Sequence, residues 1–331
     1  MAEANFQTAD NRNLDTLLTS TMEHVMNSGA FQDAIFDATP LTSALRKAGQ
    51  VKMVSGGERI RVSLMYGANG TAGSYSGDDL LDVTRQEGFT SAFYNWKQYS
   101  ASLVVTGREK RINGDLKSRV LSISDMKMKQ AASSLIDVVT TGIYSDGTGN
   151  GSKNITGLEA LIETTPGTTA YAGVPTTNTA WRNNVKTSSG AAATNLLPDL
   201  RTQYNNAAKG SGMAATPPDC IMTTQTVFES LEALLFPQLR YTSNDEANAG
   251  FDKLRFKNAK VQWDTYCTAG TAYILNLNHL YLFCHVEANF APSGKGMQKP
   301  INQDVLVDQV LFQGNLAGDN RKKFSKITGI T

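Results

Sequence analysis

The chain has 331 residues, of which 40% are hydrophobic, so it can bury a sizeable core in one or two compact lobes. Lys and Arg number 31 and Asp and Glu number 30, a balance that excludes the strongly basic class of proteins whose main task is to grip nucleic acid phosphates, although it allows non-specific contact with DNA. No apolar run approaches the ~20 residues that span a bilayer and the start of the chain is polar, so we predict no membrane association, no signal peptide and synthesis in the cytoplasm.

Residues 1–50 predict an N-terminal arm made of short helices. Apolar residues at helical spacing predict an amphipathic helix over residues 13–27. Shorter helical stretches follow on both sides of Pro40, a residue that interrupts a helix. The apolar stripe of the first helix includes Leu14, Leu17 and Leu18.

Residues 51–107 predict an extended loop built as a two-stranded β-ribbon. Ile60, Val62 and Leu64 alternate with mostly polar side chains, which indicates an outgoing strand with one apolar face. A tip rich in Gly, Ser, Thr and Asn follows, and residues 89–106 return as a strand. Two strands cannot bury both of their faces. The aromatic side chains of the ribbon therefore pack either on a neighbouring subunit or on a sheet of their own domain, and the sequence leaves both arrangements open.

A spine helix and a mixed lobe come next. Apolar residues predict one helix over residues 115–144, which would be about 45 Å long. Residues 161–264 alternate helix and strand patterns, which is typical of a compact mixed lobe. Short apolar runs then predict strands at residues 273–275, 281–284, 305–307 and 310–312. The fold class is α+β.

The residues that could carry chemistry do not form a recognisable site. Cys220, Cys267 and Cys284 include no CxxC pair, so we predict three reduced, mostly buried thiols. Cys284 and His285 are neighbours in a predicted strand and point to opposite faces, whereas Cys267 with His279 lacks a group that would orient the pair. No ligand spacing indicates a metal site, and no motif indicates a cofactor. We therefore predict that the protein is not an enzyme and that it acts through its surfaces.

Short strings occur along the chain in a characteristic order. SGGERI, LMY and FTSAFYNWKQ belong to the predicted ribbon, YSDGTG and ITGL follow the spine helix, and LRFKNA precedes the last strands, which begin with YILN. In this order the strings resemble the major capsid proteins of tailed bacteriophages, a family that shares the Hong Kong-97-like coat fold. The resemblance extends from about residue 30 to the C-terminus.

The resemblance implies a division of the chain into four parts. These are an N-terminal arm over residues 1–50, an extended loop over 51–107, a peripheral domain over 108–160 and 265–331, and an axial domain over 161–264. It implies that many copies self-assemble as hexamers and pentamers into the icosahedral head shell of a virion, around double-stranded DNA, in the cytoplasm of a host bacterium. The partners that it implies are a separate scaffolding protein and a portal, and it allows a decoration protein.

In this family the arm and the extended loop reach across neighbouring subunits, so their side chains are the candidate contacts between copies. The candidates on the arm are Leu14, Leu17 and Leu18, and those on the loop are Tyr66, Tyr75, Arg85, Phe89, Phe93, Tyr94 and Trp96. Arg85 is the only basic residue of the tip, which contains no lysine. Covalent crosslinking between a tip lysine and an asparagine, known in some members of the family, is therefore not expected here.

Other functions remain open at this point. An encapsulin-like nanocompartment shell would have the same fold and would enclose cargo instead of DNA. A small α/β hydrolase that depends on a cysteine belongs to a different class and would need an oriented base. A monomeric adhesin would need a signal peptide.

Overall fold

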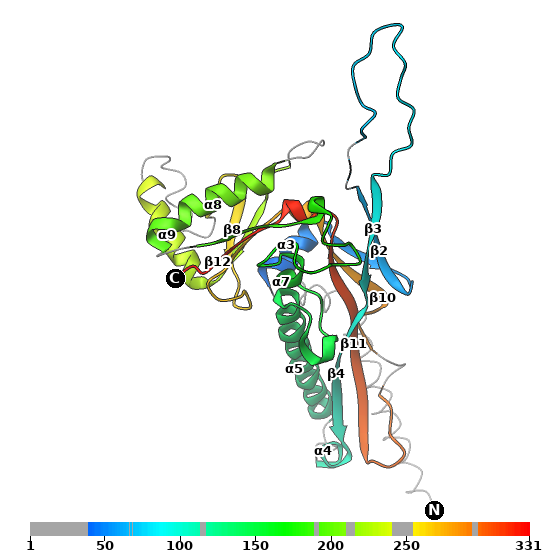
Figure 1. Cartoon of the computed structure of the whole chain (residues 1–331). Coiled ribbons are helices and arrows are strands. Elements are labelled where there is room, and N and C mark those ends of the chain that lie inside the picture. Colours follow the sequence, from blue (N-terminus) through cyan, green and yellow to red (C-terminus); the bar gives the residue numbers. More distant parts are fainter. Residues whose placement is uncertain are drawn as a thin grey trace, which may run out of the picture.

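The computed structural model describes residues 39–65, 67, 69–112, 117–188, 192–209, 216–239, 254–292 and 297–331. Two β-sheets and one long helix organise these residues, and a two-stranded ribbon carries a loop away from them (Figure 1). The helix predicted over residues 13–27 lies outside the described residues. Within them, no helix is both long and apolar enough to cross a membrane.

A four-stranded sheet beside the spine helix forms the part of the molecule that we call the spine lobe. In order across the sheet, its strands are β1 (Val51–Val54), β10 (Leu280–Pro292), β11 (Val305–Gly318) and β4 (Lys97–Thr106). The spine helix α5 (Lys117–Tyr144) packs against β4 and buries Met128, Leu135 and Val139. The prediction of a helix over residues 115–144 is confirmed for residues 117–144, and residues 115 and 116 lie outside the described residues.

Long strands replace the short ones predicted near the C-terminus. β10 has 13 residues and β11 has 14, and the two pair antiparallel. The strands predicted at residues 305–307 and 310–312 are parts of β11, although Asp308 and Gln309 interrupt the apolar pattern between them. The backbone nevertheless pairs with β4 through this interruption, where Asp308 lies opposite Leu103. Backbone hydrogen bonds do not depend on side-chain polarity, so the strand continues.

A six-stranded sheet with two helices forms the second part, which we call the side lobe. In order, its strands are β5 (Asn184–Thr187), β12 (Ser325–Thr328), β9 (Ala272–Leu275), β6 (Cys220–Thr223), β8 (Ala259–Trp263) and β7 (Arg255–Phe256). The helices α8 (Ala192–Ala208) and α9 (Gln225–Leu239) pack on it. Their buried side chains include Leu196, Leu200, Val227 and Leu231, which share one apolar cluster with Ile221 and Ile274. Pro237, predicted to stop α9, lies inside it.

The chain crosses between the two sheets more often than the predicted division implies. β9 and β12 belong to residues 265–331, which we assigned to the peripheral domain, yet both lie in the sheet of the side lobe. Ile274 of β9 lies opposite both Ser325 and Ile221. Residues 265–331 therefore supply strands to both sheets, which the sequence could not indicate because strand patterns do not identify the partner strand.

The ribbon is shorter than predicted. Only β2 (Arg59–Met65) and β3 (Phe89–Asn95) pair with each other, in an antiparallel two-stranded sheet. The predicted returning strand divides at Trp96, after which β4 joins the sheet of the spine lobe. Gly57 allows the turn between β1 and β2, because its φ of 111° is one that side chains disfavour. Both ends of the predicted ribbon are therefore parts of the spine lobe.

Short helices complete the described residues. They are α3 (Pro40–Lys47), α4 (Gly107–Ile112), α6 (Gly149–Ser152), α7 (Leu158–Leu161), η1 (Thr179–Trp181), η2 (Leu277–His279) and η3 (Arg321–Lys323). The helix predicted after Pro40 corresponds to α3, which has this proline at its first position. Proline is well suited to that position because the first turn of a helix does not use its N–H groups.

Two buried cations join the C-terminal segment to α7. The Nζ atom of Lys326 forms an ion pair with Glu159, whose Oε2 atom also accepts a hydrogen bond of 2.7 Å from the hydroxyl of Tyr273. The side chain of Lys326 is only 1% exposed, whereas that of Glu159 is 29% exposed. Arg321 forms a second ion pair with Glu163, at 3.5 Å, and donates to the carbonyl of Leu161. These contacts hold η3 and β12 against α7 and the residues that directly follow it.

Candidate assembly surfaces

The inner face of the ribbon packs on its own subunit. The alternation predicted for β2 is confirmed, because Ile60, Val62 and Leu64 are buried while the residues between them are exposed. On β3, Tyr94 is 3% exposed and its hydroxyl donates a hydrogen bond of 2.9 Å to the carbonyl of Gly318. Of the two arrangements that the sequence left open, this face therefore adopts packing within its own chain.

Tyr94, predicted as a contact between subunits, is instead buried within its own subunit. Its ring meets that of Tyr171 edge-on, with centroids 5.9 Å apart. Burial raises the pKa of its hydroxyl, which remains a hydrogen-bond donor. Trp96 is partly buried, and its Nε1 atom donates to the carbonyl of Gly57 at 2.8 Å. Both residues were candidates because they are aromatic, a property that serves a core and an interface equally well.

The outer face of the ribbon carries three exposed apolar side chains among polar ones. Phe89 is 78% exposed, and Met65 and Phe93 are also exposed. Two of these, Phe89 and Phe93, were predicted contacts, and the structure places them on the same strand, β3. Large apolar side chains that gather on one exposed face are typical of an interaction surface.

The tip of the loop projects beyond the ribbon, away from both lobes (Figure 1). Its described residues, 67 and 69–88, form no helix or strand, and polar side chains shape local turns. Asp79 accepts a hydrogen bond from the backbone N–H of Ser76 at 2.8 Å, and Asp82 accepts two from Thr84. The hydrogen bonds from Thr84 lower the pKa of Asp82, so this carboxylate stays ionised at neutral pH.

Exposed apolar side chains are concentrated on this tip. Tyr75 and Arg85, both predicted contacts, are exposed. Sequence reasoning missed Leu80, Leu81 and Val83, which are exposed as well. The available signal was the string DDLLDV, which places three large apolar residues next to carboxylates without a helical or strand period. The remaining candidates, Leu14, Leu17, Leu18 and Tyr66, lie outside the described residues.

The opposite end of the spine lobe carries cationic side chains. We define this basic end by residues 107–111, 126–129 and 297–304, which include α4 and the connection between β10 and β11 (Figure 1). Its cations are Arg108, Lys110, Arg111, Lys127, Lys129 and Lys299, and its carboxylates are Glu109 and Asp304. Because Asp304 is shared by Arg111 at 2.8 Å and Lys299 at 3.5 Å, positive charge remains in excess.

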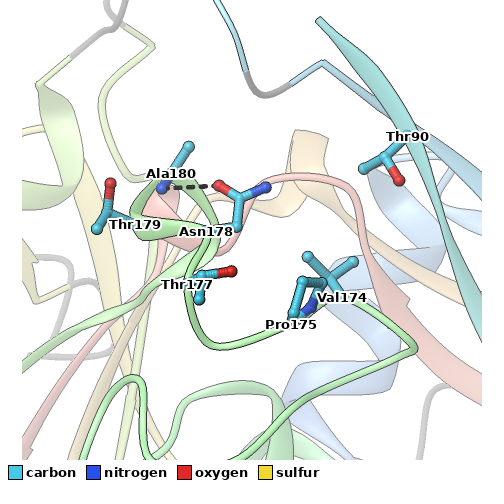
Figure 2. Close-up of a pocket in the computed structure, with 7 residues that line it drawn as sticks. All are labelled: Thr90, Val174, Pro175, Thr177, Asn178, Thr179 and Ala180. Atoms are coloured by element: carbon cyan, nitrogen blue, oxygen red, sulfur yellow. Dashed lines mark hydrogen bonds between the residues drawn. The ribbon is translucent and has the colours of Figure 1, made fainter. Parts of the chain in front are cut away.

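A groove at the base of the ribbon is lined by side chains without an ionisable group. It has a volume of about 520 Å³ and lies between Thr90 of β3 and the loop over residues 174–180 (Figure 2). Asn178 shapes this loop by accepting a hydrogen bond of 3.1 Å from the backbone N–H of Ala180. The lining consists of hydroxyl, amide and apolar side chains, none of which titrates near neutral pH. Its lining therefore holds no acid or base that could activate one of the threonine hydroxyls.

The cysteines are buried as predicted. Burial raises the pKa of Cys220, Cys267 and Cys284 to about 12, so these thiols carry little thiolate at neutral pH. The Nδ1 atom of His279 shares a hydrogen bond of 2.8 Å with Asp319. The sulfur of Cys267 lies 3.7 Å from the hydroxyl oxygen of Thr271. Among the described residues, no three His, Cys, Asp or Glu side chains are grouped to hold a metal ion. The buried, protonated thiols and the partners of His279 do not favour the alternative that the protein is a hydrolase with a cysteine nucleophile.

No family model and no curated protein matches the sequence. Among solved structures, the chain is similar to one titled as the capsid asymmetric unit of cyanophage A-1(L), with a TM-score of 0.62, 17% identity, and coverage of 87% of this chain and 93% of that one. The capsid of a native GTA particle has a TM-score of 0.57, 10% identity, and coverage of 87% and 90%. The capsid of Myoviridae phage XM1 has a TM-score of 0.54, 10% identity, and coverage of 86% and 91%.

These matches extend over nearly the whole of each chain, although the sequence identity is low. The protein therefore has the Hong Kong-97-like fold of tailed-phage capsid proteins.

Proposed function

We propose that the chain is a structural major capsid protein that self-assembles into the head shell of a tailed phage. The observation that carries this proposal is the projecting tip, whose apolar side chains Leu80, Leu81 and Val83 are uncovered in the isolated subunit. A subunit that exposes such side chains far from its core gains stability when another molecule covers them. The solved structures with a similar fold are capsids, which supports the proposal that the covering molecule is another copy of this chain.

Several finer features belong to the same proposal. The spine lobe would form most of the peripheral domain and the side lobe the axial domain, with hexamers and pentamers as the units of an icosahedral shell. The shell would assemble in the cytoplasm of a host bacterium around double-stranded DNA, which it would contact without sequence preference. A separate scaffolding protein, a portal and a decoration protein are the proposed partners. The proposed role is structural and requires neither catalysis nor a cofactor.

Removal of residues 67–77 tests the proposal. The deletion is expected to leave a folded, soluble subunit, because β2 and β3 remain joined through residues 78–88 and keep their seven paired positions. Shell formation is expected to fail or to decrease at least ~10-fold, because the shortened loop can no longer reach a neighbour. The measurement is the yield of closed particles in electron micrographs of the expressed full chain and the deletion variant.

Circular dichroism and urea unfolding of both proteins serve as the control for folding. A deletion variant that closes particles in normal yield would contradict the proposed role of the loop. Nuclease-protected DNA inside particles recovered from infected cells would distinguish a virion shell from a nanocompartment shell.

A further inference from the structure

We propose that residues 163–183 form a strap that fixes the direction of the ribbon within its own subunit, and that Arg321 is the positioning residue that holds this strap. Arg321 begins η3, in the C-terminal segment that supplies β12 to the side lobe, and its side chain is only 3% exposed. The inference concerns a single subunit, so it goes beyond the proposed function and does not depend on how copies associate.

Arg321 joins the two ends of the strap. Its guanidinium group forms an ion pair of 3.5 Å with Glu163 at the first end and donates a hydrogen bond of 3.3 Å to the side-chain oxygen of Asn183 at the other. Asn183 in turn donates through Nδ2 to the backbone carbonyl of Glu163 at 2.9 Å. The guanidinium group also donates to the carbonyl of Leu161 at the end of α7. Several partners around one plane suit a guanidinium group, whereas the ammonium group of a lysine lacks this fixed geometry.

Aromatic rings of the strap lie against the same cation. The guanidinium carbon of Arg321 is 4.6 Å from the centre of the Tyr171 ring and 6.0 Å from that of Trp181. The Nε1 atom of Trp181 donates to the carbonyl of Tyr171 at 3.3 Å, which links the two aromatic residues. A cation over an aromatic face is attracted by the ring quadrupole, and most strongly where water is excluded. These contacts attach the middle of the strap to the C-terminal segment.

The strap meets the ribbon at a tight turn. Tyr171 and Val174 pair across this turn, in which Ala172 and Gly173 have positive φ angles of 55° and 80°. The carbonyl of Ala172 accepts a hydrogen bond of 2.9 Å from the backbone N–H of Phe93 on β3. This N–H bonds to the strap and not to β2, so the contact lies on the free edge of the ribbon. An alanine in the left-handed region is costly, and it occurs here at the residue that contacts the ribbon.

The strap restrains the ribbon in a direction that the base of the ribbon does not. The hydroxyl of Tyr94 bonds to Gly318 on the inner face, whereas the bond from Phe93 lies in the plane of the strands. Further along β3, the groove separates Thr90 from the strap (Figure 2). Each strand of the ribbon has seven residues, a length of about 24 Å, so a rotation of about 10° at the base would displace the far end by about 4 Å. The contact with the strap therefore sets where the ribbon points.

Spin labels on the ribbon and on the spine helix test the proposal. Ser63→Cys on β2 and Ser134→Cys on α5 provide two exposed positions, while the three native thiols are buried and react little. Pulsed electron paramagnetic resonance of this full chain is expected to give one narrow distribution of distances. Arg321→Lys keeps a positive charge beside Glu163 but loses the planar contacts, so the distribution is expected to become at least ~2-fold wider. Labelled chains are diluted with unlabelled chains of the same variant, so that distances between copies contribute little.

Two changes at Tyr171 provide a second test, which does not require Arg321→Lys to fold. Tyr171→Leu removes the ring that contacts both Arg321 and Tyr94, and it is expected to widen the distribution as well. Tyr171→Phe keeps the ring and removes only a buried hydroxyl that has no hydrogen-bond partner among the described residues. This variant is expected to retain the narrow distribution.

Ile327→Ala is the matched control for loss of stability. Ile327 is buried in the same C-terminal segment, but it belongs to the apolar cluster of the side lobe, which contains no residue of the strap. Its replacement is expected to lower the urea midpoint and to leave the distance distribution unchanged. A narrow distribution in both Arg321→Lys and Tyr171→Leu, or an equally wide one in Ile327→Ala, would overturn the proposal and leave the proposed shell function standing.

Discussion

Replacement of Glu159 by alanine is expected to lower the free energy of unfolding by about 4 kcal/mol. The change leaves the ammonium group of Lys326 almost completely buried, with a side chain that is 1% exposed, and removes the carboxylate that balances its charge. The hydroxyl of Thr164, 3.1 Å from Nζ, remains as a partner, but it is neutral. A buried charge without a counter-ion is one of the few defects of this size that a single substitution can cause.

The opposite replacement, Lys326→Met, is expected to cost less, about 2 kcal/mol. It leaves the carboxylate of Glu159 without its cation, but this side chain is 29% exposed and still accepts a hydrogen bond from Tyr273. Water can therefore hydrogen-bond to the carboxylate of Glu159 and replace part of the stabilisation that the ammonium group provided. The matched control is Lys260→Met on the exposed side of β8, which is expected to change stability by less than about 0.5 kcal/mol.

Urea unfolding of the full chain at one protein concentration provides the three values. The expected order of destabilisation is Glu159→Ala, then Lys326→Met, then Lys260→Met. Equal effects of the first two variants would contradict the argument, because the difference in burial between the two partners would then have no energetic consequence.

Replacement of Gly157 by alanine is expected to destabilise the subunit by about 3 kcal/mol. A Cβ atom at this position would lie 2.3 Å from the carbonyl oxygen of Ile143 and 2.5 Å from that of Gly142. Both atoms belong to the backbone at the end of the spine helix, so no side chain can move aside to relieve the clash. The chain must pass this close because residue 157 leads directly into α7, which carries Glu159.

Gly73→Ala is the matched control for this prediction. Nothing lies within 4 Å of its added Cβ atom, and its φ is not in the positive region. This variant is expected to retain the urea midpoint of the wild type, whereas Gly157→Ala lowers it. A Gly157→Ala variant that unfolds at the wild-type midpoint would show that the end of the spine helix can shift at little cost.

The sequence predicts local elements well where one face of an element has a regular period. The alternation of Ile60, Val62 and Leu64 correctly identifies a buried face, and the spine helix follows from its apolar stripe. The same alternation does not identify the residues that cover this face. Periodicity is a property of one strand, whereas burial depends on a second element that packs against it. For this reason Tyr94 was assigned to an interface, whereas it packs under Gly318 of β11.

The candidate contacts on the tip were predictable only in part. Tyr75 was among the predicted contacts because it is an aromatic side chain in a polar loop. Leu80 and Val83 were not, since isolated apolar residues in an irregular segment match neither the helical nor the strand period. These side chains matter as candidate contacts because they are exposed to solvent. Their exposure follows from the projection of the whole loop away from the lobes, which the neighbouring residues in the sequence do not reveal.

The central claim is that copies of this chain associate through their projecting loops into a closed shell. Light scattering and electron microscopy of the purified full chain, over a wide range of protein concentration, test it most directly. The account predicts closed particles with a mass far above the 35.7 kDa of one chain. A homogeneous species of one-chain mass at every concentration, with Leu80 and Phe89 protected from solvent within that single molecule, would contradict it.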